Sequence, residues 1–326
     1  MLKKIKNKLR RFVRERELKK YYTNTEPLKL TGKTQLVLML DGKTMHGGLV
    51  DRLKGIVSVK SLANQLGCDF KVHIAPGYFN LDEFLHINKE FYADDSEIYY
   101  NKKFVKPIFL NDIMYAEKES LLNVFSNNKL AQYHIYCNQD YLKLLNSYAD
   151  KNVSSLAWGK EFHQLFSFDT YYTNFKNEIK GNENSCGIHL RFTSALGDFK
   201  DTAVHNLTEG EKINLINQCT EQVLKVITES KYNHYYIFSD SVTFLKHIKP
   251  IIINKDLARI TIMDDGIGHV DMSDDEQVLK RTILDFYLLS TCNEIVQVKG
   301  PHMYNSNFSR YASYINDIKF TLDSFN

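Results

Sequence analysis

The sequence lacks the features by which several classes of protein are recognised. Its five cysteines are scattered and form no Cys-x-x-Cys pair, which argues against a disulfide framework or a thiolate metal site. No apolar run approaches the roughly 18 residues that a membrane-spanning helix needs, and no signal-peptide segment is present. We therefore expect reduced thiols and a protein that is made and kept in the cytoplasm.

Proline and glycine are also sparse, with 5 and 15 residues among 326, and no repeat or low-complexity linker marks a domain boundary. The chain is long enough for two domains of ordinary size or for one large domain. Hydrophobic residues make up 43% and charged residues 25%, which is the composition of a globular protein. The domain boundaries must therefore be inferred from the hydrophobic pattern.

Positive charge is concentrated at the N-terminus. Residues 1–20 contain ten Lys or Arg and two Glu, a net charge of +8, so the rest of the chain carries −5 of the total +3. The net negative charge of residues 21–326 argues against a nucleic-acid partner. Five apolar residues of this leader share one helical face: Leu2, Ile5, Leu9, Phe12 and Val13. The basic leader, residues 1–22, is typical of a helix on an anionic membrane surface, here the inner face of the membrane. The alternatives are a helix that packs on the body and a disordered tail.

The first half of the chain begins with a β-loop-α-β pattern. Residues 34–40 read as a strand, 41–48 as a loop, and the apolar spacing from Leu49 predicts a helix that ends at Gly67. A second strand is predicted at 70–74. Residues 80–170 are rich in Tyr, Phe and Asn, and we predict that they are mostly helical. We expect this N-terminal Rossmann-like domain to span residues 32–170.

The second half alternates strands and helices four times. The predicted strands are 187–190, 234–238, 259–263 and 294–298; the predicted helices are 209–230, a segment ending near 249, 274–290 and a segment from about 307. This order predicts a parallel sheet with right-handed crossovers, hence a second Rossmann-like domain over residues 171–326. In such sheets ligands bind beyond the carboxyl ends of the strands.

Polar residues stand at those predicted strand ends: His189 with Arg191, Ser239-Asp240, Asp264-Asp265 and the loop before Ser306. The planar fork of Arg191 suits a phosphate, which it binds through two charge-assisted hydrogen bonds. Ser306 and Asn307 stand where a loop enters a helix, and the free N–H groups there also favour a phosphate oxygen. For Arg191 alone, a structural ion pair is the alternative to a ligand contact.

Asp285 is a carboxylate inside the apolar run 283–289, where burial without partners is costly. It needs donors, which an N-cap, an arginine or a ligand would supply. Guanine is one such ligand, because its N1–H and N2–H₂ groups can both donate to one carboxylate. The sequence contains no Asp-x-Asp, the usual way to hold a divalent metal on a diphosphate. If the site binds a diphosphate, cationic and backbone groups must replace the metal, and Arg191 fits that role.

Four stretches together resemble the superfamily of GDP-fucose-dependent fucosyltransferases, which includes the α1,2-, α1,6-, nodulation and protein O-fucosyltransferases. "GIHLR" is similar to the family's His-x-Arg motif, and "IFSDS" to its Ser-Asp motif after the next strand. Residues 283–313 resemble the C-terminal motif, an Asp-centred helix, a strand and a Ser-containing loop that enters a helix. "GGLVDRLKGI" resembles the glycine-rich N-terminal motif. The four occur in the family's order over most of the chain.

The resemblance implies a GT-B fold of class α/β, with two Rossmann-like domains facing a central cleft and the donor mainly in the C-terminal one. It implies an inverting, metal-independent transfer of fucose from GDP-fucose to a hydroxyl group of a glycan acceptor, with no cofactor, as in polysaccharide or lipopolysaccharide synthesis. The residue roles that it implies are as follows: Arg191, Ser306 and Asn307 bind the diphosphate, His189 and Asp285 bind guanine, Asp240 lines the donor pocket, and Gly47 and Gly48 let the first loop approach the reacting groups.

The catalytic base is open. The family's common pattern is His-x-Arg-x-x-Asp, whereas here "FTSALGD" delays the acid to Asp198. Asp198 is the first candidate and Asp51 the second. Two other functions also stay open at this point: a glycosyltransferase that uses another nucleotide sugar, and a non-catalytic nucleotide- or sugar-binding module.

Overall fold

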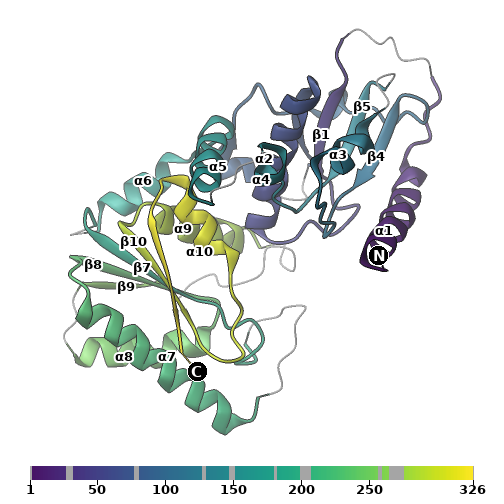
Figure 1. Ribbon diagram of the computed structural model, residues 1–326. Coiled ribbons are helices and arrows are strands. Elements are labelled where there is room, and N and C mark those ends of the chain that lie inside the picture. The colour runs from purple at the N-terminus through teal and green to yellow at the C-terminus, as the bar shows by residue number, and fades with distance from the viewer. Residues whose placement is uncertain are drawn as a thin grey trace. The chain divides into compact units, whose positions relative to one another are not determined.

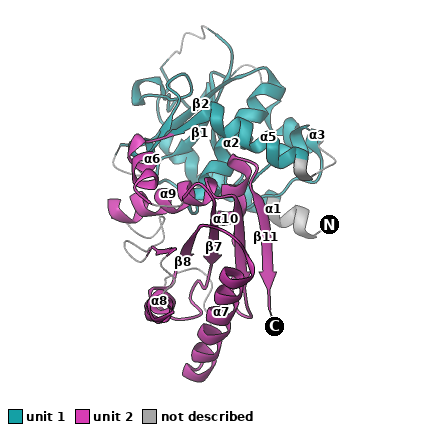
Figure 2. Ribbon diagram, turned by 90° about the vertical axis from the view of Figure 1, so that its left-hand side faces the viewer, with its two compact units in different colours: residues 1–167 teal, residues 168–326 magenta. Residues whose placement is uncertain are grey.

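The computed structural model describes residues 2–26, 32–76, 81–126, 130–146, 151–179, 182–198, 207–255, 259–263 and 275–325. The chain divides into two compact units, residues Met1–Ser167 and Phe168–Asn326 (Figure 2). The sequence-based boundary after residue 170 lies close to this division.

Unit 1 is built on a four-stranded sheet of order β2-β1-β5-β4, in which every pair of neighbours is parallel (Figure 1). Its strands are β1 (Gln35–Leu40), β2 (Asp69–Ile74), β4 (Val105–Phe109) and β5 (Gln132–Tyr136). The predicted strand 34–40, the helix from Leu49 and the strand 70–74 are confirmed within about one residue. The helix α2 (Leu49–Leu66) begins after Gly48 and ends at Gly67, whose φ of 65° is the left-handed conformation that glycine adopts at a helix end.

The prediction that residues 80–170 are mostly helical is wrong, because β4 and β5 both lie in that range. Pro107 sits inside β4, and a proline argues against a strand unless the strand lies at an edge, as β4 does. β5 carries the polar residues Gln132 and His134, so its sequence lacks the apolar pattern of a buried strand. His134 is nevertheless fully buried. Both ring nitrogens have polar partners there, since Nδ1 lies 2.8 Å from the Tyr22 hydroxyl and Nε2 lies 3.0 Å from Gln132.

The remaining elements of unit 1, apart from the helix of the basic leader, lie mostly in this stretch. They are the helices α3 (Lys118–Leu122), α4 (Leu142–Asn146) and α5 (Lys151–Leu165), the strand pair β3 (Leu85–Ile87) and β6 (Phe166–Phe168), and four 3₁₀ turns at Lys19–Tyr21, Leu81–Glu83, Asp95–Glu97 and Asn123–Phe125.

The basic leader forms a helix, α1 (Leu2–Leu18), that packs beside β4 (Figure 1). Leu18 is buried in a cluster with Val37, Phe109 and Tyr136. Upstream, the Glu15 carboxylate accepts a hydrogen bond from the backbone N–H of Phe109 at 3.3 Å. The leader therefore packs on the body through its last turns, which is one of the alternatives that the sequence left open.

Unit 2 contains a five-stranded parallel sheet of order β11-β10-β7-β8-β9. Its elements are β7 (Ser185–Leu190), β8 (His234–Ser239), β9 (Ile260–Ile262), β10 (Glu294–Lys299), β11 (Lys319–Ser324), α6 (Thr170–Asn177), α7 (Glu209–Glu229), α8 (Val242–Asn254), α9 (Glu276–Ser290) and α10 (Asn307–Ile315). The predicted alternation of strands and helices is confirmed. The edge strand β11 was not predicted, because its sequence "KFTLDS" carries only two apolar residues.

Helices cover both faces of the unit 2 sheet: α7 and α8 lie on one side, and α9 and α10 on the other (Figure 1). Along β7 the side chains alternate. Ile188 and Leu190 belong to the apolar core beneath α7 and α8. Gly187 and His189 face α9 and α10, where a side chain at Gly187 would meet Leu289 at 2.7 Å. The pleat of β7 therefore aims His189 away from the main apolar core of the unit.

Gly55 allows a close backbone approach in unit 1. A Cβ atom there would lie 1.9 Å from the carbonyl oxygen of Cys137, just after β5, whereas a Cβ at Gly210 in α7 would meet nothing within 4 Å. We predict that Gly55→Ala lowers the free energy of unfolding by at least about 2 kcal/mol, because the backbone must move apart. The control variant Gly210→Ala leaves it unchanged or raises it by up to about 1 kcal/mol. Urea denaturation of both variants measures this, and an equal effect of the two would contradict the close packing at Gly55.

Candidate functional site

The carboxyl edge of the unit 2 sheet brings together side chains that the sequence placed at strand ends. His189 is in β7, Arg191 directly follows it, and Asp240 directly follows β8. The loop after β10 joins them, because the backbone N–H of Tyr304 donates to the Arg191 carbonyl oxygen at 3.0 Å. That loop leads to Ser306, the N-cap of α10. Parallel strands meet at one edge of the sheet, which explains this convergence.

Asp240 holds the turn after β7. Its Oδ1 accepts from the backbone N–H of Phe192 and its Oδ2 from that of Thr193, both at 2.7 Å. Oδ2 also lies 3.3 Å from the guanidinium of Arg191. Thr193 has a φ of 53°, a left-handed conformation that is unfavourable for a β-branched residue. The Asp240 carboxylate therefore fixes both a strained backbone turn and the direction of Arg191.

Burial raises the pKa of Asp240 to about 6, although Arg191 and the two backbone N–H groups act in the opposite direction. At neutral pH the carboxylate is therefore ionised and able to hold Arg191. The Arg191 side chain itself is 21% exposed, so part of it reaches the surface.

His189 is a neutral ring in this site. Burial, with the nearby charge of Arg191, lowers its pKa to about 3. The ring stacks on Phe308 of α10 at 5.7 Å between centroids. Within the described part of the chain, its buried Nδ1 has no hydrogen-bond partner, and the buried Oγ1 of Thr193 has none either. Buried polar atoms are nearly always paired, so two such atoms beside Arg191 are suited to contact a ligand.

The start of α10 is the third component of the site. The Oγ of Ser306 accepts from the backbone N–H of Phe308 at 3.1 Å, while Asn307 is exposed. The fully buried amide of Gln297, beside His189 in the register of β10 and β7, lies 3.3 Å from the Ser309 hydroxyl. Gln297 therefore anchors the first turn of this helix to the sheet. The first turn of a helix attracts anions.

Asp285 has an arginine partner. Arg281, one turn earlier on α9, donates to its Oδ1 at 2.6 Å and also to the backbone carbonyl of Met263 at 2.6 Å. Burial raises the pKa of Asp285 to about 6, against the effect of Arg281. Of the three kinds of donor that the sequence left open, the arginine is therefore present. The contact with guanine stays a prediction.

Asp198, the first candidate base, is engaged with the start of α8. Its Oδ2 accepts from the Ser241 hydroxyl at 2.9 Å and from the backbone N–H of Thr243 at 2.6 Å. This is a helix-capping arrangement, which gives the carboxylate a structural task. The acidic pair Asp264-Asp265 lies outside the described residues.

The remaining predicted residues belong to unit 1. Gly47 has a φ of 81°, and a Cβ atom there would lie 2.6 Å from Oδ2 of Asp51. Its carbonyl accepts from Nε of Arg52 at 2.9 Å, and Gly48 is the N-cap of α2. Asp51 pairs with Lys54 at 2.6 Å and its side chain is 41% exposed. Only glycine at position 47 allows this turn to close against the first turn of α2.

Several residues of the site were not predicted from the sequence. They are Thr193, Arg281, Gln297, Tyr304 and Phe308. Thr193 and Phe308 lie next to predicted residues, so proximity in the sequence was an available signal. Gln297 gave a second signal, because it is a polar residue inside the predicted strand 294–298. Among the described residues, no three or more His, Cys, Asp or Glu side chains form a metal-binding cluster.

Comparison with solved structures defines the class of fold. Both units are α/β with parallel sheets, and the fold is the GT-B fold of fucosyltransferases, as predicted. No protein-family model matches the sequence, and no curated protein matches it significantly.

Three of the similar structures are fucosyltransferases with low sequence identity to this chain. The fucosyltransferase NodZ from Bradyrhizobium is 12% identical, with 86% of this chain and 91% of that chain covered and a TM-score of 0.50. A variant of Arabidopsis thaliana FUT1 in complex with GDP is 11% identical, with 95% and 73% covered and a TM-score of 0.54. POFUT1 in complex with GDP is 11% identical, with 93% and 100% covered and a TM-score of 0.50. At these identities the likeness establishes the fold alone.

The raised pKa of Asp240 predicts how stability depends on pH. Its pKa of about 6 in the folded protein exceeds the ordinary value of 3.8, so the protonated form favours folding. This contribution is fully present below about pH 4 and is lost as the pH rises through 6. We predict that the free energy of unfolding of the wild type, relative to Asp240→Asn, falls by about 2 kcal/mol between pH 4 and pH 7.

Urea denaturation of both proteins across this range measures the difference, in which the other titrating groups cancel. A difference that rises with pH would show that Arg191 and the backbone N–H groups outweigh burial.

Proposed function

We propose that this protein is an inverting fucosyltransferase that transfers fucose from GDP-fucose to a hydroxyl group of a glycan, in the synthesis of a surface polysaccharide or lipopolysaccharide. The observation that carries the proposal is the position of Arg191, which Asp240 holds at the carboxyl edge of the unit 2 sheet. The loop after β10 contacts Arg191 there and leads into the first turn of α10. The fold supports it, because two fucosyltransferases with similar folds were solved in complex with GDP.

The proposed mechanism follows from charge. As fucose leaves GDP, negative charge grows on the β-phosphate, and a fixed guanidinium stabilises the transition state more than the ground state. Arg191 has this role, with Ser306 and Asn307 at the start of α10. Neutral His189 and the carboxylate of Asp285 bind guanine. In this mechanism no metal takes part, since cationic and backbone groups neutralise the diphosphate.

The base that activates the acceptor hydroxyl is proposed from the exposure of the two candidate carboxylates and from the partners that each already has. The Oδ2 of Asp198 already accepts two hydrogen bonds from the start of α8. Asp51 also has a partner, Lys54 at 2.6 Å through Oδ1, but its side chain is 41% exposed and it follows the Gly47-Gly48 loop that opens α2. We therefore place Asp51 before Asp198, which reverses the order that the sequence suggested.

The donor class is tested by ligand-induced stabilisation. We predict that GDP and GDP-fucose each raise the melting temperature by several degrees, because a ligand that binds only the folded state stabilises it, and that UDP-glucose does not. With GDP-fucose and a glycan acceptor, turnover should persist in the presence of EDTA. Stabilisation by UDP-glucose alone would indicate another donor, stabilisation by GDP without turnover a binding module, and loss of turnover restored by Mn²⁺ a metal-dependent enzyme.

Arg191 variants identify the site in the same assay. Arg191→Ala should reduce turnover by about 10²–10³, and Arg191→Lys should restore little of it, since an ammonium group lacks the planar fork. The melting temperature should change far less than turnover. A large fall in melting temperature, with normal turnover per folded molecule, would instead make Arg191 a structural partner of Asp240.

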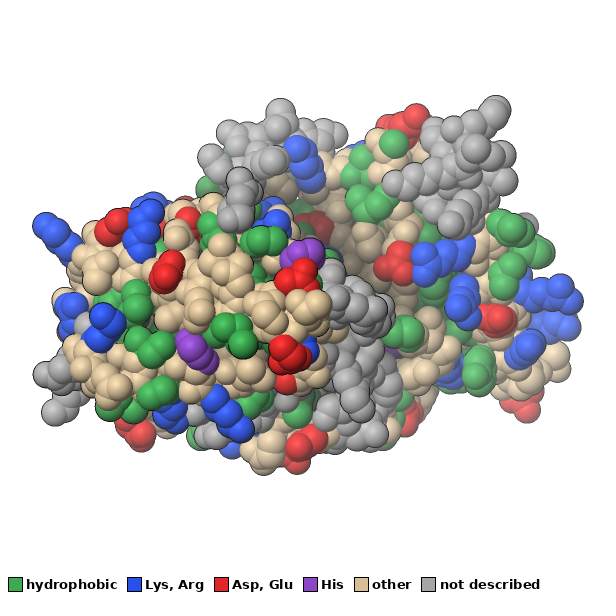
Figure 3. All heavy atoms as spheres, turned by 90° about the horizontal axis from the view of Figure 1, so that it is seen from below, with side chains coloured by type: hydrophobic (Ala, Val, Ile, Leu, Met, Phe, Trp, Pro, Cys, Tyr) green, Lys and Arg blue, Asp and Glu red, His purple; other side chains and the backbone are tan. Residues whose placement is uncertain are grey.

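We also propose that α1 associates with the anionic inner face of the membrane. Leu9, Phe12 and Val13 are 62%, 64% and 45% exposed, although the helix packs on unit 1 through Leu18 and Glu15. In Figure 3, hydrophobic side chains lie beside Lys and Arg side chains at the right-hand end, where α1 lies. The side chains of Leu2 and Ile5 lie outside the described part of the chain. Among the described residues, no helix is long and apolar enough to cross a membrane.

The triple variant Leu9→Ser, Phe12→Ser and Val13→Ser tests this association without removing the buried end of α1. Its affinity for phosphatidylglycerol vesicles should fall at least about tenfold, because three apolar side chains no longer enter the bilayer. Vesicle co-sedimentation measures the affinity. The control variant changes three exposed apolar residues outside α1 to Ser: Met114, Ile213 and Ile253. An equal effect of the two variants, or no effect of either, would contradict the proposal.

A further inference from the structure

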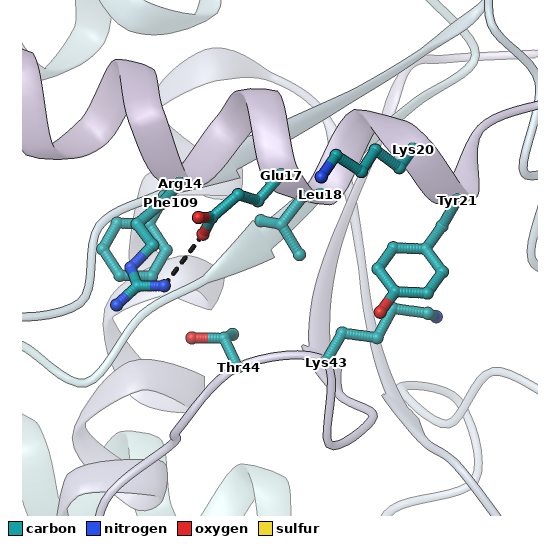
Figure 4. A pocket seen from close by; sticks show the side chains of 8 residues that line it. All are labelled: Arg14, Glu17, Leu18, Lys20, Tyr21, Lys43, Thr44 and Phe109. Atoms are coloured by element: carbon teal, nitrogen blue, oxygen red, sulfur yellow. Dashed lines mark hydrogen bonds and ion pairs between the residues drawn. The ribbon is translucent and has the colours of Figure 1, made fainter.

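A pocket with a cavity volume of about 400 Å³ lies in unit 1, between the last turns of α1 and the loop after β1. Eight residues line it: Arg14, Glu17, Leu18, Lys20, Tyr21, Lys43, Thr44 and Phe109 (Figure 4). Figure 4 shows the side chains from α1 and its end on one side of the pocket, with Lys43 and Thr44 from the loop opposite them. Its size is that of an ordinary small-ligand site.

The pocket is cationic. Three positive side chains line it, from Arg14, Lys20 and Lys43. The carboxylates of Glu17 in the lining and of Asp41 beside Lys43 leave an excess of one positive charge. Arg14 pairs with Glu17 at 2.8 Å. The charge of the lining therefore favours an anionic ligand.

Lys43 is the fixed cation of the pocket. Its Nζ donates to Oδ2 of Asp41 at 2.8 Å and to the Tyr100 hydroxyl at 2.7 Å, and it lies 4.2 Å from the centre of the Tyr100 ring. Burial opposes its charge, but the hydrogen bonds to Asp41 and Tyr100 outweigh burial and raise its pKa. Lys43 therefore stays an ammonium ion, in one position, at every physiological pH.

The position of the pocket is that of a ligand site in a parallel sheet. Lys43 and Thr44 follow the carboxyl end of β1, and Phe109 is the last residue of β4. The same loop continues to Gly47 and Gly48 at the start of α2. Ligands bind beyond the carboxyl ends of strands in such sheets. The leader helix, which lies outside the alternation of strands and helices, supplies the other wall.

We propose that this pocket binds an anionic sugar, one that carries a carboxylate or a phosphate group, as part of the glycan acceptor. The proposal rests on the proposed glycosyl transfer, for which it names the acceptor class. The cations of Lys20, Lys43 and Arg14 pair with the anionic group. The ring of Tyr21, a residue that is 51% exposed, gives an apolar surface on which a pyranose ring can lie.

The shape of the site favours a glycan over a bilayer surface. A flat membrane requires exposed side chains on a convex face, and the exposed residues Leu9, Phe12 and Val13 of α1 provide them outside the pocket. The pocket instead encloses its ligand between α1 and a loop. Leu18, buried at 3% exposure, closes its floor together with Phe109.

The test compares two pairs of substitutions with the same change in charge. The pocket variant is Arg14→Gln with Lys20→Gln. The control variant is Arg16→Gln with Lys19→Gln, two exposed residues of the same basic segment that do not line the pocket. The probes are sialyllactose and glucose 6-phosphate, each with its neutral counterpart, lactose or glucose. Calorimetric titration of the full-length protein at low salt measures binding, and thermal unfolding shows that both variants fold.

We expect the wild type to bind each anionic probe more tightly than its neutral counterpart, by at least about fivefold. The pocket variant should lose this preference, whereas the control variant should change it less than about twofold. Equal losses in both variants would overturn the proposal and show a diffuse effect of the basic leader. Binding of phosphatidylglycerol vesicles that depends on Arg14 and Lys20, with no preference for anionic sugars, would overturn it in favour of a lipid headgroup.

Thermal stabilisation by GDP distinguishes a failure of this proposal from a failure of the proposed function. Stabilisation by GDP should be the same in the wild type and both variants. If GDP stabilises the protein but the anionic probes show no preference, the pocket proposal is wrong and the donor assignment stands. If the anionic probes bind through Arg14 and Lys20 while GDP has no effect, the pocket is an anionic-sugar site and the fucosyltransferase assignment is wrong.

Discussion

The geometry of the candidate site depends on one buried carboxylate. Asp240 accepts the backbone N–H groups of Phe192 and Thr193 and pairs with Arg191, so it connects the ends of β7 and β8. Without these three donors, a charge with 5% exposure would be costly. With them, it holds Thr193 in a left-handed conformation and directs Arg191 along the sheet edge. The strain in the turn and the orientation of the arginine therefore have the same cause.

The same topological rule operates in both units. Each sheet is parallel, so all its strands end at one edge, and the polar loops collect there. In unit 2 the edge presents Arg191 and the start of α10; in unit 1 it presents Lys43 and Thr44. Positive charge therefore stands at the carboxyl edge of each sheet. A donor diphosphate and an anionic acceptor would both be recognised by this kind of edge.

The leader helix combines a buried end with an exposed apolar face. Its Leu18 and Glu15 pack on unit 1, as expected for a helix that packs on the body. Its Leu9, Phe12 and Val13 lie on a different part of the helix surface and stay exposed, as expected for a membrane-associated helix. An amphipathic pattern identifies a face that needs covering. It does not identify a second contact that relies on polar residues such as Glu15.

The sequence by itself determined the order of strands and helices in most of the chain, because apolar periodicity reports which face of each element is buried. It also placed His189, Arg191, Asp240 and Ser306 at one edge, since strand ends converge in any parallel sheet. Arg281 lies one helical turn before Asp285, a local spacing that the sequence already contains. Only the tertiary structure decided two other partners: the start of α8 for Asp198, and Phe308 for His189. It also decided that β5 is a buried strand despite its polar residues. Hydrogen bonds and ring contacts join residues distant along the chain, and no local pattern records them.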